Sequence, residues 1–97
     1  MIEWPFDTDK LIEICRKNDI ARVSVFGSMA RAEATEQSDI DLLVYLSKPK
    51  SLLGMIALER QFTAALGRQV DLLTEEDISP YMRPRVKRDL QVVYETS

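Results

Sequence analysis

The sequence predicts an α/β (α+β) protein in which helices pack on a three-stranded mixed sheet. Apolar residues recur at helical spacing in three segments, and three short strand-like runs lie between these segments. The resulting order is helix–strand–turn–strand–helix–strand–helix, which favours an α/β layer structure. The 97 residues are expected to form a single domain, 1–97.

The first part of the chain is expected to form a helix, a strand and a tight turn. Residues 9–18 place apolar side chains on one helical face, and Asp7 or Thr8 can cap the first turn. Residues 21–26 alternate in polarity, which predicts a strand. A glycine–serine pair then ends this strand and opens a short helical turn.

The second part of the chain is expected to add two strands and two helices. Residues 39–46 and 69–73 are the strands, and a helix over residues 51–66 stops at Gly67. The last helix should be properly formed from Pro84 onwards. The expected buried sides are Leu52, Met55, Leu58, Phe62 and Leu66 in the first helix, and Ile78, Met82, Val86, Leu90 and Val93 in the second.

The connections between the strands predict the topology. A whole helix separates the second and third strands, so these should be parallel, whereas the short link between the first two allows an antiparallel pair. The end of the first strand then lies beside the start of the second. Because Asp41 and Asp71 lie equally deep in their strands, they should come alongside each other.

The composition limits the available chemistry. The chain has no histidine, and its one cysteine, Cys15, is expected to be a small core residue, so a histidine-activated nucleophile and a zinc cage are excluded. A formal charge of −3 argues against general nucleic-acid binding. No apolar run is long enough to span a bilayer and no leader pattern is present, so we expect a cytoplasmic protein without membrane insertion.

Two carboxylates at the start of the second strand are the most informative feature. Asp39 and Asp41 project to the same face of the strand, where like charges repel, and folding alone does not require that arrangement. Their backbone positions lie about 7 Å apart, so their side chains can converge on metal ions. Asp71 adds a third carboxylate. Without metal, the three charges should raise one another's pKa.

Oxygen ligands of this kind select magnesium, or manganese, over zinc. Two ions are expected. One would hold the triphosphate of a nucleotide, and the other would lower the pKa of an acceptor hydroxyl, with Asp71 as ligand or proton acceptor. Gly27 and Ser28 suit phosphate binding through backbone amides and a hydroxyl, and Arg31 can add a charged contact. Ser28 is not expected to be a nucleophile, because no base can activate it.

Two features leave alternatives open. Glu59 interrupts an apolar helical stripe and is interpreted as an edge position that pairs with a nearby arginine. The basic residues Arg83, Arg85, Lys87 and Arg88 form either a solvated helix face or a docking surface for an acidic partner or RNA. A chain this short is also expected to need a partner chain to recognise at least one substrate.

Two motifs occur in order: Gly27-Ser28-Met29-Ala30-Arg31 and Ser38-Asp39-Ile40-Asp41-Leu42-Leu43-Val44. Together they resemble the signature of the DNA polymerase β superfamily. More closely, the chain resembles its minimal nucleotidyltransferases (MNT), the MntA-like antitoxins of HEPN/MNT toxin–antitoxin pairs. The resemblance continues through Leu58-Glu59-Arg60, Gly67-Arg68-Gln69-Val70-Asp71-Leu72 and Val93-Tyr94-Glu95, and so covers nearly the whole chain.

The resemblance implies a polymerase β-like nucleotidyltransferase core. It implies that Gly27 and Ser28 bind nucleotide phosphates. It further implies that Asp39 and Asp41 hold magnesium and that Asp71 is the third catalytic carboxylate. Members of this group transfer AMP from ATP to a tyrosine hydroxyl of the cognate HEPN ribonuclease toxin and so neutralise it.

The expected function is therefore that of an active adenylyltransferase antitoxin. Ala32 stands where the group commonly has glycine, which costs turn freedom but removes no ligand. One alternative is a non-catalytic antitoxin that neutralises its partner by binding. Another is a nucleotidyltransferase that acts on a small molecule, although such enzymes resemble this chain only in their catalytic half.

Overall fold

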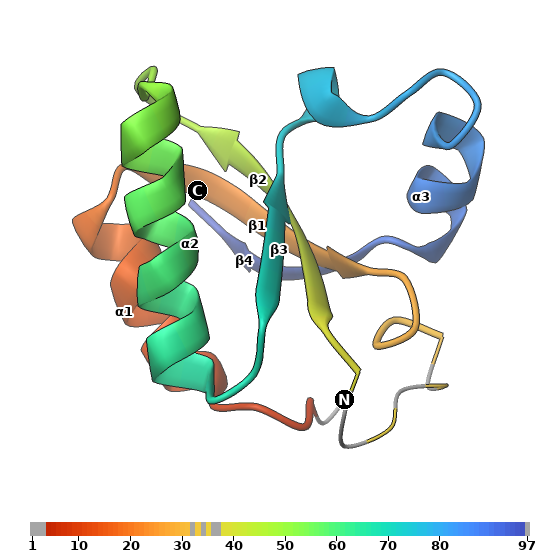
Figure 1. The fold of residues 1–97 in the computed structure, drawn as a ribbon, viewed down its shortest axis with the longest axis horizontal. Helices are drawn as coiled ribbons and strands as arrows, with labels where there is room; N and C mark the ends of the chain where they lie inside the picture. The colour runs from red at the N-terminus through yellow and green to blue at the C-terminus, as the bar shows by residue number, and fades with distance from the viewer. Residues whose placement is uncertain (1–3, 32, 34, 36–37, 97) are drawn as a thin grey trace.

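The computed structural model describes residues 4–31, 33, 35 and 38–96. Its elements are α1 (Thr8–Lys17), β1 (Ile20–Phe26), β2 (Ile40–Leu46), α2 (Leu52–Leu66), β3 (Val70–Leu73), the 3₁₀ turn η1 (Glu75–Asp77), α3 (Arg83–Asp89) and β4 (Gln91–Glu95). Helices α1 and α2 lie on one side of the sheet and α3 lies on the other (Figure 1), which confirms the predicted fold class. No helix within these described ranges is long and apolar enough to cross a membrane.

The sheet has four strands, in the order β3-β2-β1-β4, where the sequence predicts three. The antiparallel β1–β2 pair and the parallel β2–β3 pair are confirmed. The prediction that the last helix continues to Val93 is wrong. Helix α3 ends at Asp89, Leu90 has an extended backbone (φ −59°, ψ 131°), and β4 pairs antiparallel with β1. This pairing satisfies backbone groups of β1 that would otherwise lack a partner strand.

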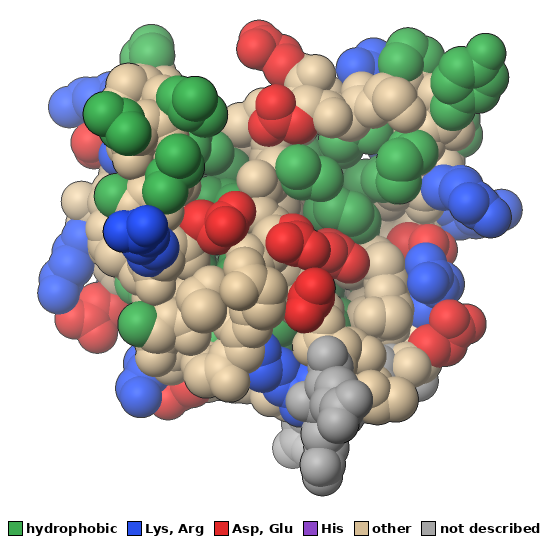
Figure 2. Space-filling model, viewed as in Figure 1, with side chains coloured by type: hydrophobic (Ala, Val, Ile, Leu, Met, Phe, Trp, Pro, Cys, Tyr) green, Lys and Arg blue, Asp and Glu red, His purple; other side chains and the backbone are tan. Residues whose placement is uncertain are grey.

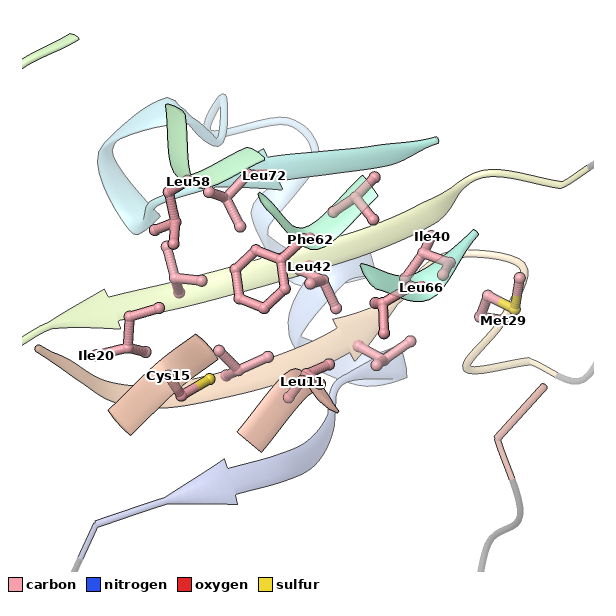
Figure 3. Packing of buried hydrophobic residues seen from close by; sticks show 14 residues of the cluster. Leu11, Cys15, Ile20, Met29, Ile40, Leu42, Leu58, Phe62, Leu66 and Leu72 are labelled. Atoms are coloured by element: carbon pink, nitrogen blue, oxygen red, sulfur yellow. The ribbon is translucent and has the colours of Figure 1, made fainter. Parts of the chain in front are cut away.

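The larger core lies between the sheet and the helices α1 and α2 (Figure 3). Leu11 and Cys15 of α1 and Leu58 and Phe62 of α2 point toward Leu42 of β2, and all five side chains are buried. The spacing of the apolar residues in both helices explains this packing, because residues three and four apart share a face. Burial raises the pKa of the Cys15 thiol to about 12, in keeping with its predicted role as a core residue.

A smaller core cluster on the opposite face holds α3 and η1 against the sheet. Phe26 and Leu43 pack there with Ile78 and Val86. Ile78 and Val86 are therefore buried as predicted, but Met82, from the same predicted stripe, is 52% exposed. Its prediction as a buried residue is wrong because α3 begins only at Arg83, so Met82 precedes the helix.

The ends of α1 and α2 follow from local sequence. The Asp7 carboxylate accepts hydrogen bonds from the amides of Asp9 and Lys10, at 3.0 and 3.2 Å. The Ser51 hydroxyl accepts from the amide of Gly54 at 3.1 Å. Gly67 ends α2 in the left-handed conformation, with φ 72°. Leu52, at the start of α2, is 78% exposed, so its prediction as a buried residue is wrong.

Candidate active site

Asp41 occupies the centre of the site, at the start of β2. Its backbone pairs with Phe26 of β1 on one side and with Asp71 of β3 on the other. The predicted alignment of Asp41 with Asp71 is thus confirmed. Asp39 directly precedes β2 and is exposed, as is Asp71. Figure 2 shows acidic side chains gathered near the middle of this face of the molecule.

The pKa of Asp41 reflects its burial and the charges of its neighbours. Its pKa is raised from 3.8 to about 6, first because partial burial disfavours the charged form. Asp71 raises the pKa further, through its charge and a hydrogen bond to Asp41, and Asp39 adds more negative charge. Arg31 acts in the opposite direction. The negative charges of Asp71 and Asp39 thus contribute to the raised pKa of Asp41, in the direction predicted for clustered carboxylates.

The donor set fits a hard divalent cation. Among the described residues, no three acidic or thiol side chains already stand in metal-binding positions. The paired backbone positions of Asp41 and Asp71 belong to neighbouring strands, which lie about 4.8 Å apart, a separation from which two carboxylates can reach one cation.

Gly27 is required beside Asp41 for two reasons. Its backbone has φ 74°, which favours glycine, and a Cβ at this position would overlap Oδ2 of Asp41. The next residues form the predicted short turn, in which the Arg31 amide donates to the Gly27 carbonyl at 3.2 Å. Ser28 in this turn is half-buried, and Met29 is buried and anchors the turn to the core. Ala32 lies outside the described residues.

Arg31 is held in place by two carboxylates. Its Nε donates to Glu33 and its terminal guanidinium nitrogen donates to Asp89, both at 3.1 Å. These hydrogen bonds, chiefly that to Asp89, raise the pKa of Arg31. Asp89 is the last residue of α3, so the ion pair ties the turn after β1 to this helix.

Arg31, Gly27 and Asp41 line a cavity of about 410 Å³. Helix α3 contributes two further arginines to its lining, Arg85 and Arg88. These two belong to the basic run whose role the sequence leaves open. These three guanidinium groups outnumber the two carboxylates of the lining, Asp41 and Asp89, and such groups are suited to pairing with phosphate. Met82, Val86 and Phe26 add apolar surface, which the sequence alone does not connect with the site.

Glu59 has a different role from the one predicted. Its carboxylate accepts a hydrogen bond from the backbone amide of Leu72 at 3.4 Å rather than pairing with an arginine. One helical turn further along α2, the Thr63 hydroxyl accepts from the amide of Val70 at 3.1 Å. Because β3 is an edge strand, these two contacts satisfy outward-facing amides that lack a partner strand. They also fix the strand that carries Asp71.

Comparison with known proteins identifies the family. The family model "Polymerase beta, Nucleotidyltransferase" matches residues 9–97. A Methanocaldococcus jannaschii protein named "Putative protein adenylyltransferase" is 43% identical over 77 residues, which cover 79% of this chain and 83% of that protein.

Solved structures share the fold. A toxin–antitoxin structure with AMP-PNP gives a TM-score of 0.80 at 22% identity and covers 94% of this chain and 75% of that chain. A complex of tri-AMPylated Shewanella oneidensis HEPN toxin with MNT antitoxin gives a TM-score of 0.70 at 22% identity, over 92% and 70% of the two chains. Because the family model spans nearly the whole sequence and the archaeal relative is similar over most of its length, the chain belongs to the polymerase β nucleotidyltransferase family.

Proposed function

We propose that this chain is a magnesium-dependent, cytoplasmic adenylyltransferase that moves AMP from ATP to a tyrosine hydroxyl of a cognate HEPN toxin, and so acts as its antitoxin. The main support for the proposal is that Asp41 and Asp71 are paired on neighbouring strands and that the Asp41 carboxylate lies against Gly27, which has no Cβ. The name of the archaeal relative supports adenylyl transfer, and the AMP-PNP and AMPylated HEPN toxin of the structural neighbours support the nucleotide and the acceptor.

The cavity beside Asp41 is the proposed nucleotide site. Its guanidinium groups, from Arg31, Arg85 and Arg88, would pair with phosphate oxygens. Amides of the turn that begins at Gly27, together with the Ser28 hydroxyl, would add neutral donors to the phosphates. A nucleotide phosphate would then compete with Glu33 and Asp89 for Arg31.

Asp39, Asp41 and Asp71 would hold two magnesium ions, or manganese, which when bound supply charge neutralisation on the phosphates and acidify the acceptor hydroxyl. The acceptor oxygen forms a bond to the α-phosphorus of ATP, and the bond from that phosphorus to the pyrophosphate oxygen breaks. Asp71, exposed on the edge strand, takes the hydroxyl proton. The pyrophosphate leaves beside the arginines of the cavity.

The test is transfer of label from α-³²P-ATP to the proposed HEPN partner, sought as the product of the neighbouring gene. We expect magnesium-dependent labelling of that protein, with added mass equal to whole AMP groups. Asp41→Asn should lower the rate about a thousandfold, because metal-held charge stabilisation is worth several kcal/mol. Glu13→Gln is the matched control, since it removes one carboxylate from the exposed face of α1 and should leave the rate unchanged.

The alternatives give different results in the same assay. If the HEPN protein remains unlabelled but is inhibited equally by wild type and by Asp41→Asn, the chain neutralises by binding alone. If label appears on a small molecule and none appears on protein, the proposed protein acceptor is wrong. Either result contradicts the proposal.

A further inference from the structure

A second hollow lies between α2 and η1. The nucleotide cavity is lined by the end of β1, the start of β2 and α3, whereas this groove, of about 650 Å³, is lined by α2, η1, the last residues of β2 and Leu72 of β3. The two hollows therefore lie toward opposite ends of β2, because Asp41 lines the first and Val44, Tyr45 and Leu46 line the second.

One wall of the groove is apolar and exposed. Leu52, Met55 and Ile56 of α2 form it, with Leu52 78% and Ile56 43% exposed. Figure 2 shows hydrophobic side chains gathered over the start of α2 and acidic side chains across the hollow from them. A group of large apolar side chains exposed on one helix face is typical of surfaces that bind another protein.

The opposite wall is acidic. Glu75, Glu76 and Asp77 of η1 line it, against one lysine, Lys50. Two of these carboxylates are already fixed. The Tyr45 hydroxyl donates to Glu75 at 3.0 Å, and Asp77 accepts from the amide of Thr74 at 2.9 Å. Fixed charges lose little entropy on binding, which favours a specific partner.

The charges that line the two hollows favour different substrates. The nucleotide cavity is lined by three arginines and two carboxylates, whereas the groove is lined by four carboxylates, that of Glu59 included, and one lysine. A triphosphate would be repelled from the groove, but a segment rich in lysine or arginine would be attracted to it. Apolar side chains of the same segment could pack on the α2 wall.

The groove also reaches the strand that carries Asp71. Glu59 and Leu72 both line it, and the Glu59 carboxylate accepts the hydrogen bond from the amide of Leu72, the residue that follows Asp71. A segment bound in the groove would therefore lie along the edge strand that carries the proposed proton acceptor.

We infer that the groove between α2 and η1 docks a basic, amphipathic segment of the acceptor protein and directs its hydroxyl group to Asp71. The inference rests on the proposed function and deepens it, because it names the surface that recognises the acceptor. Lysine or arginine side chains of the segment face η1, and its apolar side chains face α2.

The test compares two neighbouring leucines. Leu52 and Leu53 are equally exposed, at 78%, but only Leu52 lines the groove. Leu52→Lys should weaken binding of the HEPN protein by about tenfold and raise its KM in the AMP-transfer assay by a similar factor. The KM for ATP and kcat should not change. Leu53→Lys introduces the same charge at the same helix end and should bind like wild type.

A charge reversal tests the acidic wall. Glu76→Lys should weaken binding at low salt, and the difference from wild type should fall in 0.5 M salt because the contact is screened. Glu13→Lys on α1 makes the same change away from the groove and should have no effect. Both binding experiments use calorimetry with the full-length HEPN protein and need no catalysis.

The outcomes separate this inference from the proposed function. If AMP is transferred but Leu52→Lys and Leu53→Lys bind the HEPN protein equally well, the docking inference is wrong and the proposed reaction stands. If binding depends on Leu52 but no AMP is transferred, the proposed reaction is wrong and the docking inference is supported. If the chain alone forms a dimer that Leu52→Lys dissociates, a second copy occupies the groove and the inference is wrong. Absence of both binding and transfer overturns both.

Discussion

Gly27 and Asp41 depend on each other. The carboxylate lies where a Cβ on residue 27 would be, and that residue has a positive φ and lines the cavity beside Asp41. Gly67, at the end of α2, has nearly the same φ, 72°, but nothing lies within 4 Å of its missing Cβ. The two glycines therefore share the requirement for backbone conformation and differ in the requirement for space.

A comparison of variants at Gly27 and Gly67 separates the effect of a Cβ that contacts Asp41 from the effect of backbone strain. Gly27→Ala and Gly67→Ala should each lose about 1 kcal/mol of unfolding free energy, because alanine is strained at positive φ. Only Gly27→Ala should also displace Asp41 and lower AMP transfer and magnesium affinity, by about tenfold or more. Urea unfolding and magnesium titration check these results. Equal transfer rates for the two variants would contradict the role assigned to Gly27.

Between elements, the contact of α2 with the edge strand β3 explains why a carboxylate interrupts an apolar stripe. Glu59 and Thr63 lie one turn apart on the helix. They accept hydrogen bonds from two β3 amides that lie two residues apart, those of Leu72 and Val70. The helical and strand repeats match along this contact. The strand that carries Asp71 is therefore held by β2 on one side and by α2 side chains on the other.

Removal of the Glu59 acceptor should loosen β3. We expect Glu59→Ala to lower the unfolding free energy by about 1 kcal/mol and to accelerate hydrogen exchange of the Leu72 amide, which loses its partner. Glu59→Gln retains an acceptor oxygen and should preserve most of the protection. NMR-detected exchange provides the measurement. Unchanged protection of Leu72 in Glu59→Ala would show that the hydrogen bond contributes little.

Elements with a strong local pattern could be predicted from the sequence, and β4 could not. The first three strands and the first two helices have clear apolar periods and defined ends, such as Ser51 and Gly67. The apolar side chains of residues 86–93 have the spacing of a helix, but residues 91–95 also suit a short strand. The free edge of β1 decides between them, and that edge exists only in the folded sheet.

The same distinction holds for the site. The alignment of Asp41 with Asp71 follows from equal depth in parallel strands, so the sequence predicts it. The approach of Arg85 and Arg88 to the cavity depends on α3 folding back over the sheet through Val86. No sequence spacing between the basic run and the carboxylates encodes that approach.

At the scale of the whole molecule, the uncompensated carboxylates affect stability. The folded-state pKa of Asp41, about 6, lies above its ordinary value of 3.8, so the folded state binds a proton more tightly than the unfolded state. The resulting stabilisation is complete below about pH 3.8 and is lost as the pH rises through 6. Metal-free protein should therefore be strained at neutral pH.

Asp41→Asn should relieve this strain. At pH 7.5 without metal, we expect the Tm of the variant to exceed that of wild type by about 2–4 °C, a modest figure because Asp41 is partly exposed and its charge is screened. At pH 4 the two proteins should melt together, because Asp41 is then protonated. Magnesium should raise the Tm of wild type at pH 7.5 and have a much smaller effect on the variant. Calorimetry at both pH values, with and without EDTA, checks this, and a lower Tm for the variant at both would contradict it.

The antiparallel pairing of β4 with β1 has a practical consequence for experiments. Glu95 lies opposite Arg22, near the beginning of β1, while Gly27 follows its far end. A fluorophore or an immobilisation linker placed at the end of β4 would therefore lie about 14 Å along the strand from the point where Phe26 pairs with Asp41. Attachment there offers a handle for single-molecule or surface-based assays at a distance from the Gly27 turn.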